Sequence, residues 1–180
     1  MIRKAVLCLL MVLFLPIANT MAADLENTLY MQLKDGHVVI EMRPDLAPHT
    51  VARIKELVRQ KFYDGVVFHR VIDGFMAQTG DPTGTGTGGS GQKLKAEFSD
   101  AKHLRGTVSM ARAADPNSAD SQFFICFAAA PWLDGQYTIW GQVIDGMEYV
   151  DHIKKGEGQS GMVADPDKII TLRVAADVEK

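Results

Sequence analysis

The sequence predicts a mainly β fold, a closed antiparallel β-barrel capped by helices, and three observations carry this prediction. Short apolar or β-branched runs recur along the chain. Glycine, proline, aspartate and asparagine separate them, which is typical of strands joined by turns. Only two stretches have the spacing of an amphipathic helix. Because closure removes exposed strand edges, so many short strands favour a barrel.

The first two predicted strands form a hairpin. Residues 27–33 and 37–42 both alternate apolar with polar side chains, so each strand has one apolar face. The Asp35-Gly36 dipeptide between them favours a tight turn. The later runs, each a predicted strand, lie at 66–72, 107–110, 123–127, 138–144 and 168–174.

Two helices are expected. The first spans residues 50–60, where Val51, Ile54, Leu57 and Val58 fall on one stripe and charged residues lie outside it. The second spans about 146–154, with its apolar side formed by Met147, Val150 and Ile153. The first helix is predicted to pack its apolar face against the sheet.

The first 23 residues have the pattern of a secretory signal peptide. Arg3 and Lys4 precede an apolar run at 5–17, and small residues follow it. That run has about 13 residues, fewer than the roughly 20 that a spanning helix needs. We therefore expect cleavage near residue 23, no stable membrane span afterwards, and a periplasmic or secreted domain of residues 24–180. We expect this domain to be a monomer.

Charge and cysteine content argue against a nucleic-acid partner and against an intramolecular disulfide. The formal net charge is −3, so the sequence shows no basic surplus for a nucleic acid, and we expect no nucleic-acid partner. Cys126 is the only cysteine that remains after the predicted cleavage, which leaves no intramolecular disulfide. Its apolar neighbours predict that the thiol is buried.

The familiar ligand motifs lack their structural context. Residues 84–89 match G-x-G-x-x-G by letter, but no strand–turn–helix unit surrounds them, so a mobile loop is the preferred interpretation over nucleotide binding. The histidines lack the spacing of metal ligands, and we expect no metal and no cofactor. No G-x-S-x-G elbow is present, and structural duty is the default for Ser109, Ser118 and Ser121.

Residues 68–81 differ from these motifs because polar side chains stand among large apolar ones. Arg70, Met76 and Gln78 have the same parity, so they share a face if the Asp73-Gly74 turn preserves the register. An arginine among Phe and Met needs acceptors for its donors. Taken alone, Arg70 is interpreted as a structural arginine bonded to a carbonyl or to glutamate, with a functional role as the alternative.

Several further segments stand out along the chain: Phe68-His69-Arg70, Gly74-Phe75-Met76, Gln78, Gly80-Asp81, Gly86-Thr87-Gly88-Gly89, Ser109-Met110-Ala111, Ser121-Gln122-Phe123-Phe124-Ile125 and Trp132-Leu133-Asp134-Gly135. Taken together, these segments resemble the signature segments of cyclophilins, the peptidyl-prolyl cis-trans isomerases. The resemblance runs in order from about Leu29 to Val174. It implies an eight-stranded β-barrel closed by two helices, with a peptide groove on the outer face. It also implies proline-containing polypeptides as partners.

The resemblance also assigns residues to roles. It makes Arg70 the catalytic arginine and Gln78 its supporting neighbour. Further residues are expected to bind substrate: an apolar proline pocket of Phe75, Met76, Phe124 and Leu133, groove residues Ala111, Arg112 and Ala113, and rim residues Gln122 and Trp132. The Trp132 position is associated in the family with cyclosporin, so cyclosporin is an expected ligand.

Some positions depart from the family pattern. Arg112 stands where asparagine is usual, and Tyr137 stands where histidine is frequent, so both are expected to change peptide preference at the groove. These departures, with the signal peptide, resemble a bacterial exported cyclophilin. Two alternatives stay open: a module that binds proline segments with little turnover, and a serine hydrolase, for which no triad context is visible.

Overall fold

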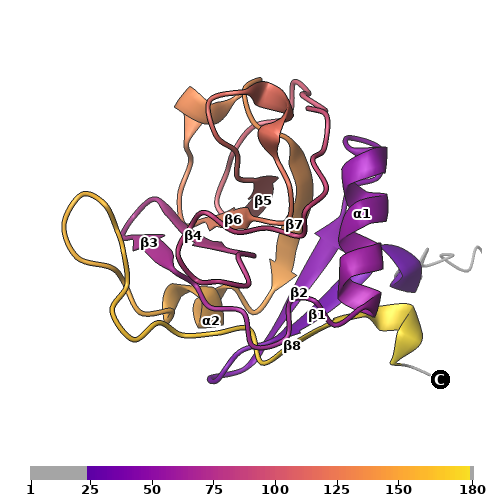
Figure 1. The fold of residues 1–180 in the computed structure, drawn as a ribbon. Helices are drawn as coiled ribbons and strands as arrows, with labels where there is room; N and C mark the ends of the chain where they lie inside the picture. The colour runs from indigo at the N-terminus through magenta and orange to yellow at the C-terminus, as the bar shows by residue number, and fades with distance from the viewer. Residues whose placement is uncertain (1–23, 179–180) are drawn as a thin grey trace, which may run out of the picture.

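Eight antiparallel strands form one continuous sheet in the order β3-β4-β6-β5-β7-β2-β1-β8 (Figure 1). The computed structural model describes residues 24–178, so the predicted signal peptide lies outside the described residues. The strands are β1 (Thr28–Gln32), β2 (His37–Met42), β3 (Arg70–Ile72), β4 (Met76–Thr79), β5 (Thr107–Met110), β6 (Phe123–Cys126), β7 (Ile139–Asp145) and β8 (Thr171–Val174).

The sheet curls into a half-barrel, and the predicted closure is not supported. β3 and β8 are the edge strands of the hydrogen-bonded order. The segments that precede them meet only through an isolated bridge between Val67 and Lys168 and through single backbone bonds such as Phe68 N to Asp167 O at 2.8 Å. The regular parts of β3 and β8 are therefore shorter than the predicted runs at 66–72 and 168–174, and within residues 24–178 no continuous ladder joins the two edges.

Two α-helices pack against the sheet. α1 (Pro48–Arg59) lies beside β1, β2 and β8 in Figure 1 and buries Val51, Ile54, Leu57 and Val58, as its spacing predicts. Pro48 suits a first helical turn because its φ is already close to helical. α2 (Met147–Asp151) is shorter than predicted and buries Val150. None of the helices within residues 24–178 is long and apolar enough to cross a bilayer.

The start of α1 is capped from a distant segment. Its N-cap residue, Ala47, provides no side-chain hydrogen bond. The carboxylate of Glu97 instead accepts from the backbone N–H of His49 at 3.0 Å and of Thr50 at 2.8 Å. These bonds satisfy donors that a helix leaves free at its first turn. They also tie α1 to the long segment between β4 and β5.

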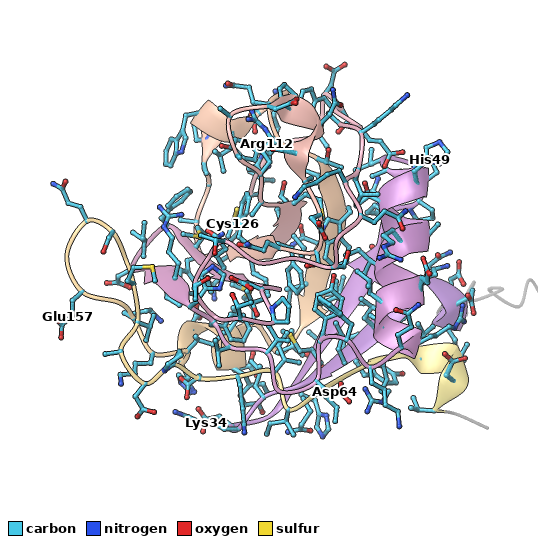
Figure 2. All side chains as sticks on the ribbon, viewed as in Figure 1. Lys34, His49, Asp64, Arg112, Cys126 and Glu157 are labelled. Carbon is cyan, nitrogen blue, oxygen red and sulfur yellow. The ribbon has the colours of Figure 1, made fainter. Side chains whose placement is uncertain are left out.

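Alternate residues of β6 point into two different apolar clusters, one on each face of the sheet. Phe123 and Ile125 point into the main core, which also contains the fully buried Trp140. Phe124 and Cys126 point to the opposite face, where they join a second cluster with Met76, Ala130 and Leu133. This is the period of two expected for a strand that is covered on both faces. Cys126 is buried as predicted, and Figure 2 shows it well inside the outline of the molecule.

Candidate active site

The second apolar cluster borders a hollow of about 300 Å³ on the outer face of the sheet. We call it the first hollow. It brings together most of the predicted site residues from four separate parts of the chain. Its lining consists of Arg70, Phe75, Met76, Gln78, Ala111, Arg112, Phe124, Trp132, Leu133 and Tyr137.

The register of β3 and β4 places the polar residues of this hollow. Arg70 pairs directly with Gln78, and Ile72 pairs with Met76. The prediction that residues 70, 76 and 78 share one face of the sheet is therefore confirmed. Gly74 in the connecting turn has φ of +70°, a conformation that glycine adopts at little cost.

Two acceptors fix the Arg70 side chain. Nη1 donates to Oε1 of Gln78 at 3.2 Å, and Nε donates to the carbonyl oxygen of Ser160 at 3.0 Å. Ser160 lies in a loop that projects beside β3, where Figure 2 labels Glu157. The bond to Ser160 matches the structural interpretation in part. Among residues 24–178, however, Nη2 has no hydrogen-bond partner, so donors remain for a ligand in the first hollow.

Gln78 is itself held in orientation. Its Nε2 donates to Oε1 of Gln122 at 2.9 Å. Nε2 of Gln122 in turn donates to the carbonyl oxygens of Gly86 at 3.0 Å and Gly88 at 2.8 Å. This chain of bonds leaves Oε1 of Gln78 as the acceptor that faces Arg70. A side-chain network of this kind positions a donor on rigid elements.

Aromatic rings form the walls. The ring centroids of Phe75 and Trp132 lie 5.5 Å apart. Trp132 is largely exposed, with 60% of its surface accessible to solvent. Opposite, the Tyr137 ring meets Phe124 edge-on at 6.0 Å, and the guanidinium of Arg112 lies 4.5 Å over the Tyr137 ring. The walls are apolar and mostly buried, while the mouth is open to solvent.

A buried histidine supports the Phe124 wall from behind. The ring of His103 stacks on Phe124 at 6.2 Å, its Nδ1 lies 3.2 Å from Oδ1 of Asp134, and its Nε2 lies 3.1 Å from Oγ of Ser109. Burial lowers the pKa of His103, while Asp134 acts in the opposite direction. The residue types match a Ser-His-Asp triad, but Ser109 is fully buried and its hydroxyl also bonds to the Thr138 carbonyl. A substrate cannot reach it, so the cluster is structural.

The glycine-rich segment 82–89 is organised by one carboxylate. Asp81 is fully buried and accepts from the backbone N–H of Thr83 at 2.7 Å, Gly86 at 2.6 Å and Gly88 at 3.1 Å. Burial raises its pKa, but the hydrogen bonds from Thr83, Gly88 and Gly86 outweigh this and lower the pKa to about 2. Gly88 must lack a side chain, because a Cβ there would overlap the Asp81 carboxylate. Residues 84–89, expected to be a mobile loop, are thus bonded to a buried carboxylate that precedes them.

A second hollow of about 320 Å³ adjoins the first and shares Gln78, Ala111 and Arg112 with it. We call it the second hollow. The predicted site residues Ala113 and Gln122 line this hollow and not the first. Its other polar lining residues are not among the predicted site residues; they are Thr87, Lys93, Ser118 and Asp120.

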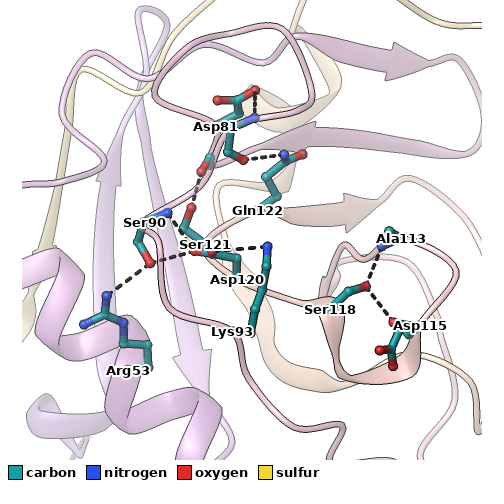
Figure 3. A network of polar contacts seen from close by, with 12 residues as sticks. Arg53, Asp81, Ser90, Lys93, Ala113, Asp115, Ser118, Asp120, Ser121 and Gln122 are labelled. Carbon is teal, nitrogen blue, oxygen red and sulfur yellow. Dashed lines mark hydrogen bonds and ion pairs between the residues drawn. The ribbon is translucent and has the colours of Figure 1, made fainter.

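Figure 3 shows how the polar side of the second hollow is built. Asp120 accepts from the N–H and the hydroxyl of Ser90, both at 2.6 Å, and pairs with Nζ of Lys93 at 3.4 Å. Arg53 of α1 donates to the same Ser90 hydroxyl at 3.1 Å. These contacts join segments that are far apart in sequence. Within residues 24–178, no three His, Cys, Asp or Glu side chains are grouped as metal ligands.

Comparisons with known proteins agree with this geometry. The profile of the family described as cyclophilin type peptidyl-prolyl cis-trans isomerase/CLD matches residues 28–174. A probable peptidyl-prolyl cis-trans isomerase of Brucella suis is 55% identical over 171 residues, which cover 88% of this chain and 87% of the relative. Fold and site together therefore define a cyclophilin-type protein.

Solved structures give the same result. A cyclophilin from Hirschia baltica has a TM-score of 0.77 at 27% identity, with 86% of this chain and 76% of that chain covered. A cyclophilin type isomerase of Cryptosporidium parvum, solved in the presence of the dipeptide Ala-Pro, has a TM-score of 0.75 at 31% identity and covers 82% of this chain and 98% of that one. This chain belongs to the family of cyclophilin type peptidyl-prolyl cis-trans isomerases.

Proposed function

We propose that this protein accelerates rotation about X-Pro peptide bonds in unfolded or flexible polypeptides, and so assists protein folding. The observation that carries the proposal is the position of Arg70: its guanidinium is fixed at the edge of an apolar hollow lined by Phe75, Met76, Phe124 and Leu133. The Ala-Pro dipeptide in the solved relative supports a proline-containing ligand.

The chemistry requires a well-placed donor and little else. Rotation about a peptide bond has a barrier of about 18–20 kcal/mol, because the amide loses its resonance as it twists. No covalent bond is made or broken. In the twisted amide the nitrogen lone pair leaves conjugation and becomes a hydrogen-bond acceptor, whereas in the planar amide it accepts almost nothing. A donor at that nitrogen therefore stabilises the transition state more than the ground state.

Arg70 is suited to this task. Its guanidinium stays protonated and presents a rigid fork of donors. With Nε held by Ser160 and Nη1 by Gln78, the fork is oriented before a ligand arrives, so little reorganisation is needed during the reaction. The apolar walls hold the pyrrolidine ring while the preceding carbonyl swings. They also favour the twisted amide, which is less polar than the planar one.

The required lowering of the activation free energy is compatible with a donor and an apolar pocket that each contribute part of it. Raising a rate of roughly 10⁻² s⁻¹ to about 10²–10³ s⁻¹ takes about 5.5–7 kcal/mol. One preorganised, charge-assisted donor contributes roughly 3–4 kcal/mol in comparable sites. Positioning of the proline ring and removal of water supply the remainder.

The test is an NMR exchange measurement on a short proline peptide, with and without the purified protein. We expect faster cis-trans exchange at protein concentrations far below that of the peptide. Binding of the peptide without faster exchange would instead identify a binding module.

Cyclosporin is proposed as a ligand of the same hollow because Trp132 lies at its rim, and it should inhibit the exchange.

We also propose export to the periplasm or secretion of a monomeric residue 24–180 domain. The support is the charge and apolar pattern of residues 1–23. N-terminal sequencing of protein recovered from a periplasmic or culture fraction tests this, and an intact Met1 would contradict it. Gel filtration of the same material tests the monomer.

A further inference from the structure

The first hollow carries two positive charges and no carboxylate. Arg70 and Arg112 both line it, and none of its other lining residues is charged. Within residues 24–178, neither guanidinium forms an ion pair. The whole chain has a formal net charge of −3, so this hollow differs in sign from the protein that carries it.

Arg112 is held at the border between the two hollows. Its Nε and Nη2 donate to the carbonyl oxygen of Gln136 at 3.2 and 3.0 Å, and Nη1 donates to the carbonyl oxygens of Ala113 at 2.9 Å and Ala114 at 3.2 Å. The guanidinium also packs over the Tyr137 ring. All these acceptors are neutral, so they fix the position of the charge without cancelling it.

The charges that line the second hollow do not compensate Arg112. In the second hollow, Asp120 is the one lining carboxylate, and it already pairs with Lys93 and accepts two bonds from Ser90. The pair of Lys93 and Asp120 contributes no net charge. Arg112, which lines both hollows, therefore leaves the border between them positive.

We propose that Arg112 determines substrate specificity by favouring polypeptides with glutamate or aspartate within two residues of the isomerised proline. This rests on the proposed function: when proline occupies the first hollow, its chain neighbours pass the border that Arg112 occupies. Lysine or arginine at the same place is disfavoured by like-charge repulsion. For partly exposed charges a few residues apart, we expect a preference of about three- to tenfold in kcat/KM, reduced by salt.

The experiment measures kcat/KM for peptides that carry Glu, Gln or Lys at one of four positions: the two residues before proline and the two residues after it. Arg112→Gln removes the charge, while Arg112→Lys keeps it but loses the planar fork that bonds Gln136 and Ala113. Lys61→Gln is the matched control, because it removes one positive charge from a separate depression next to β8.

The expected result is a Glu-over-Lys ratio of about three to ten at one or more positions in the wild type and in the Lys61→Gln variant. The ratio should persist in Arg112→Lys and fall toward one in Arg112→Gln. A ratio near one at every position in the wild type, or an unchanged ratio in Arg112→Gln, would overturn the role of Arg112. If the wild type accelerates none of the peptides, including the Gln series, the proposed function itself fails.

Discussion

Arg70 and Gln78 face each other across the β3–β4 hairpin, with Nη1 of the arginine 3.2 Å from Oε1 of the glutamine. Because both residues belong to regular strands, backbone register sets this half of the donor fork, while the Ser160 carbonyl in a distant loop holds Nε. Gln122 holds the far end of Gln78 through a second bond of 2.9 Å. The orientation of Arg70 thus depends on a polar chain that reaches the glycine-rich segment.

Removing Gln78 should slow the reaction with little effect on binding. We expect Gln78→Ala to lower kcat about five- to tenfold, because it deletes one hydrogen bond worth about 1 kcal/mol that orients Arg70. KM should change less than twofold. Steady-state kinetics on a proline peptide measure both values. Gln60→Ala, at the exposed end of α1, is the matched control, and an unchanged kcat in Gln78→Ala would show that Arg70 needs no such support.

Replacing Asp81 should destabilise the protein. The lowered pKa, about 2 against an ordinary 3.8, corresponds to about 2 kcal/mol of stability. A carboxyl whose folded pKa is lowered stabilises the protein above its unfolded pKa, and this stability is lost as the pH falls from about 3.8 to about 2. Urea unfolding at pH 7 should therefore show Asp81→Asn to be less stable by about that amount.

The pH profile provides the control for Asp81. The difference in unfolding free energy between wild type and Asp81→Asn should shrink as the pH falls through that window. The exposed Asp100→Asn change should leave stability within about 0.5 kcal/mol at either pH. A difference that does not depend on pH would mean that the Asp81 charge is unimportant to the loop.

His69 should make the protein sensitive to mild acid. It is buried, and its ring makes no side-chain hydrogen bond among the described residues. Burial lowers its pKa below the ordinary 6.5, although Asp81 opposes this. As the pH falls below about 6.5, His69 is therefore protonated more readily in the unfolded chain than in the folded one. The free energy of unfolding decreases in that range.

The variant His69→Phe tests this loss. It removes the titrating group and keeps a ring in the same place. We expect nearly equal unfolding free energies at pH 7.5, and a variant that is more stable than the wild type at pH 5, because burial of the neutral imidazole then lowers the stability of the wild type alone. Equal stability at both pH values would contradict the account of His69.

Trp132 should report occupation of the first hollow. The chain contains two tryptophans, of which Trp140 is fully buried in the core and Trp132 is largely exposed at the rim. A bound proline peptide covers Trp132, so fluorescence emission should shift to shorter wavelength. Trp140→Phe should keep this shift and Trp132→Phe should lose it. A shift that survives in Trp132→Phe would place the ligand elsewhere.

Much of the local structure follows from sequence periodicity. The alternation in β6 separates Phe123 from Phe124, and the parity of Arg70, Met76 and Gln78 places them on one face, because strand side chains repeat every two residues. The aromatic walls follow only from the resemblance to cyclophilins, because no local sequence pattern indicates that Trp132 and Phe75 meet.

Contacts between distant segments could not be predicted in this way. Ser160, which holds Nε of Arg70, is 90 residues away and contributes only a backbone carbonyl, which any residue type supplies. The pairing of Lys93 with Asp120 likewise depends on how two irregular segments pack. The predicted barrel closure is not supported, because apolar runs such as 66–72 extend beyond the residues that form regular ladders.

The most direct test of the central claim is the effect of Arg70→Ala on kcat/KM, measured together with peptide affinity and thermal stability. We predict a fall in kcat/KM of about 100-fold or more, with peptide Kd within about threefold and Tm within a few degrees of the wild type. The guanidinium would then act on the twisted amide and not on binding or folding. Catalysis within twofold of the wild type, in a variant that remains folded, would contradict the account.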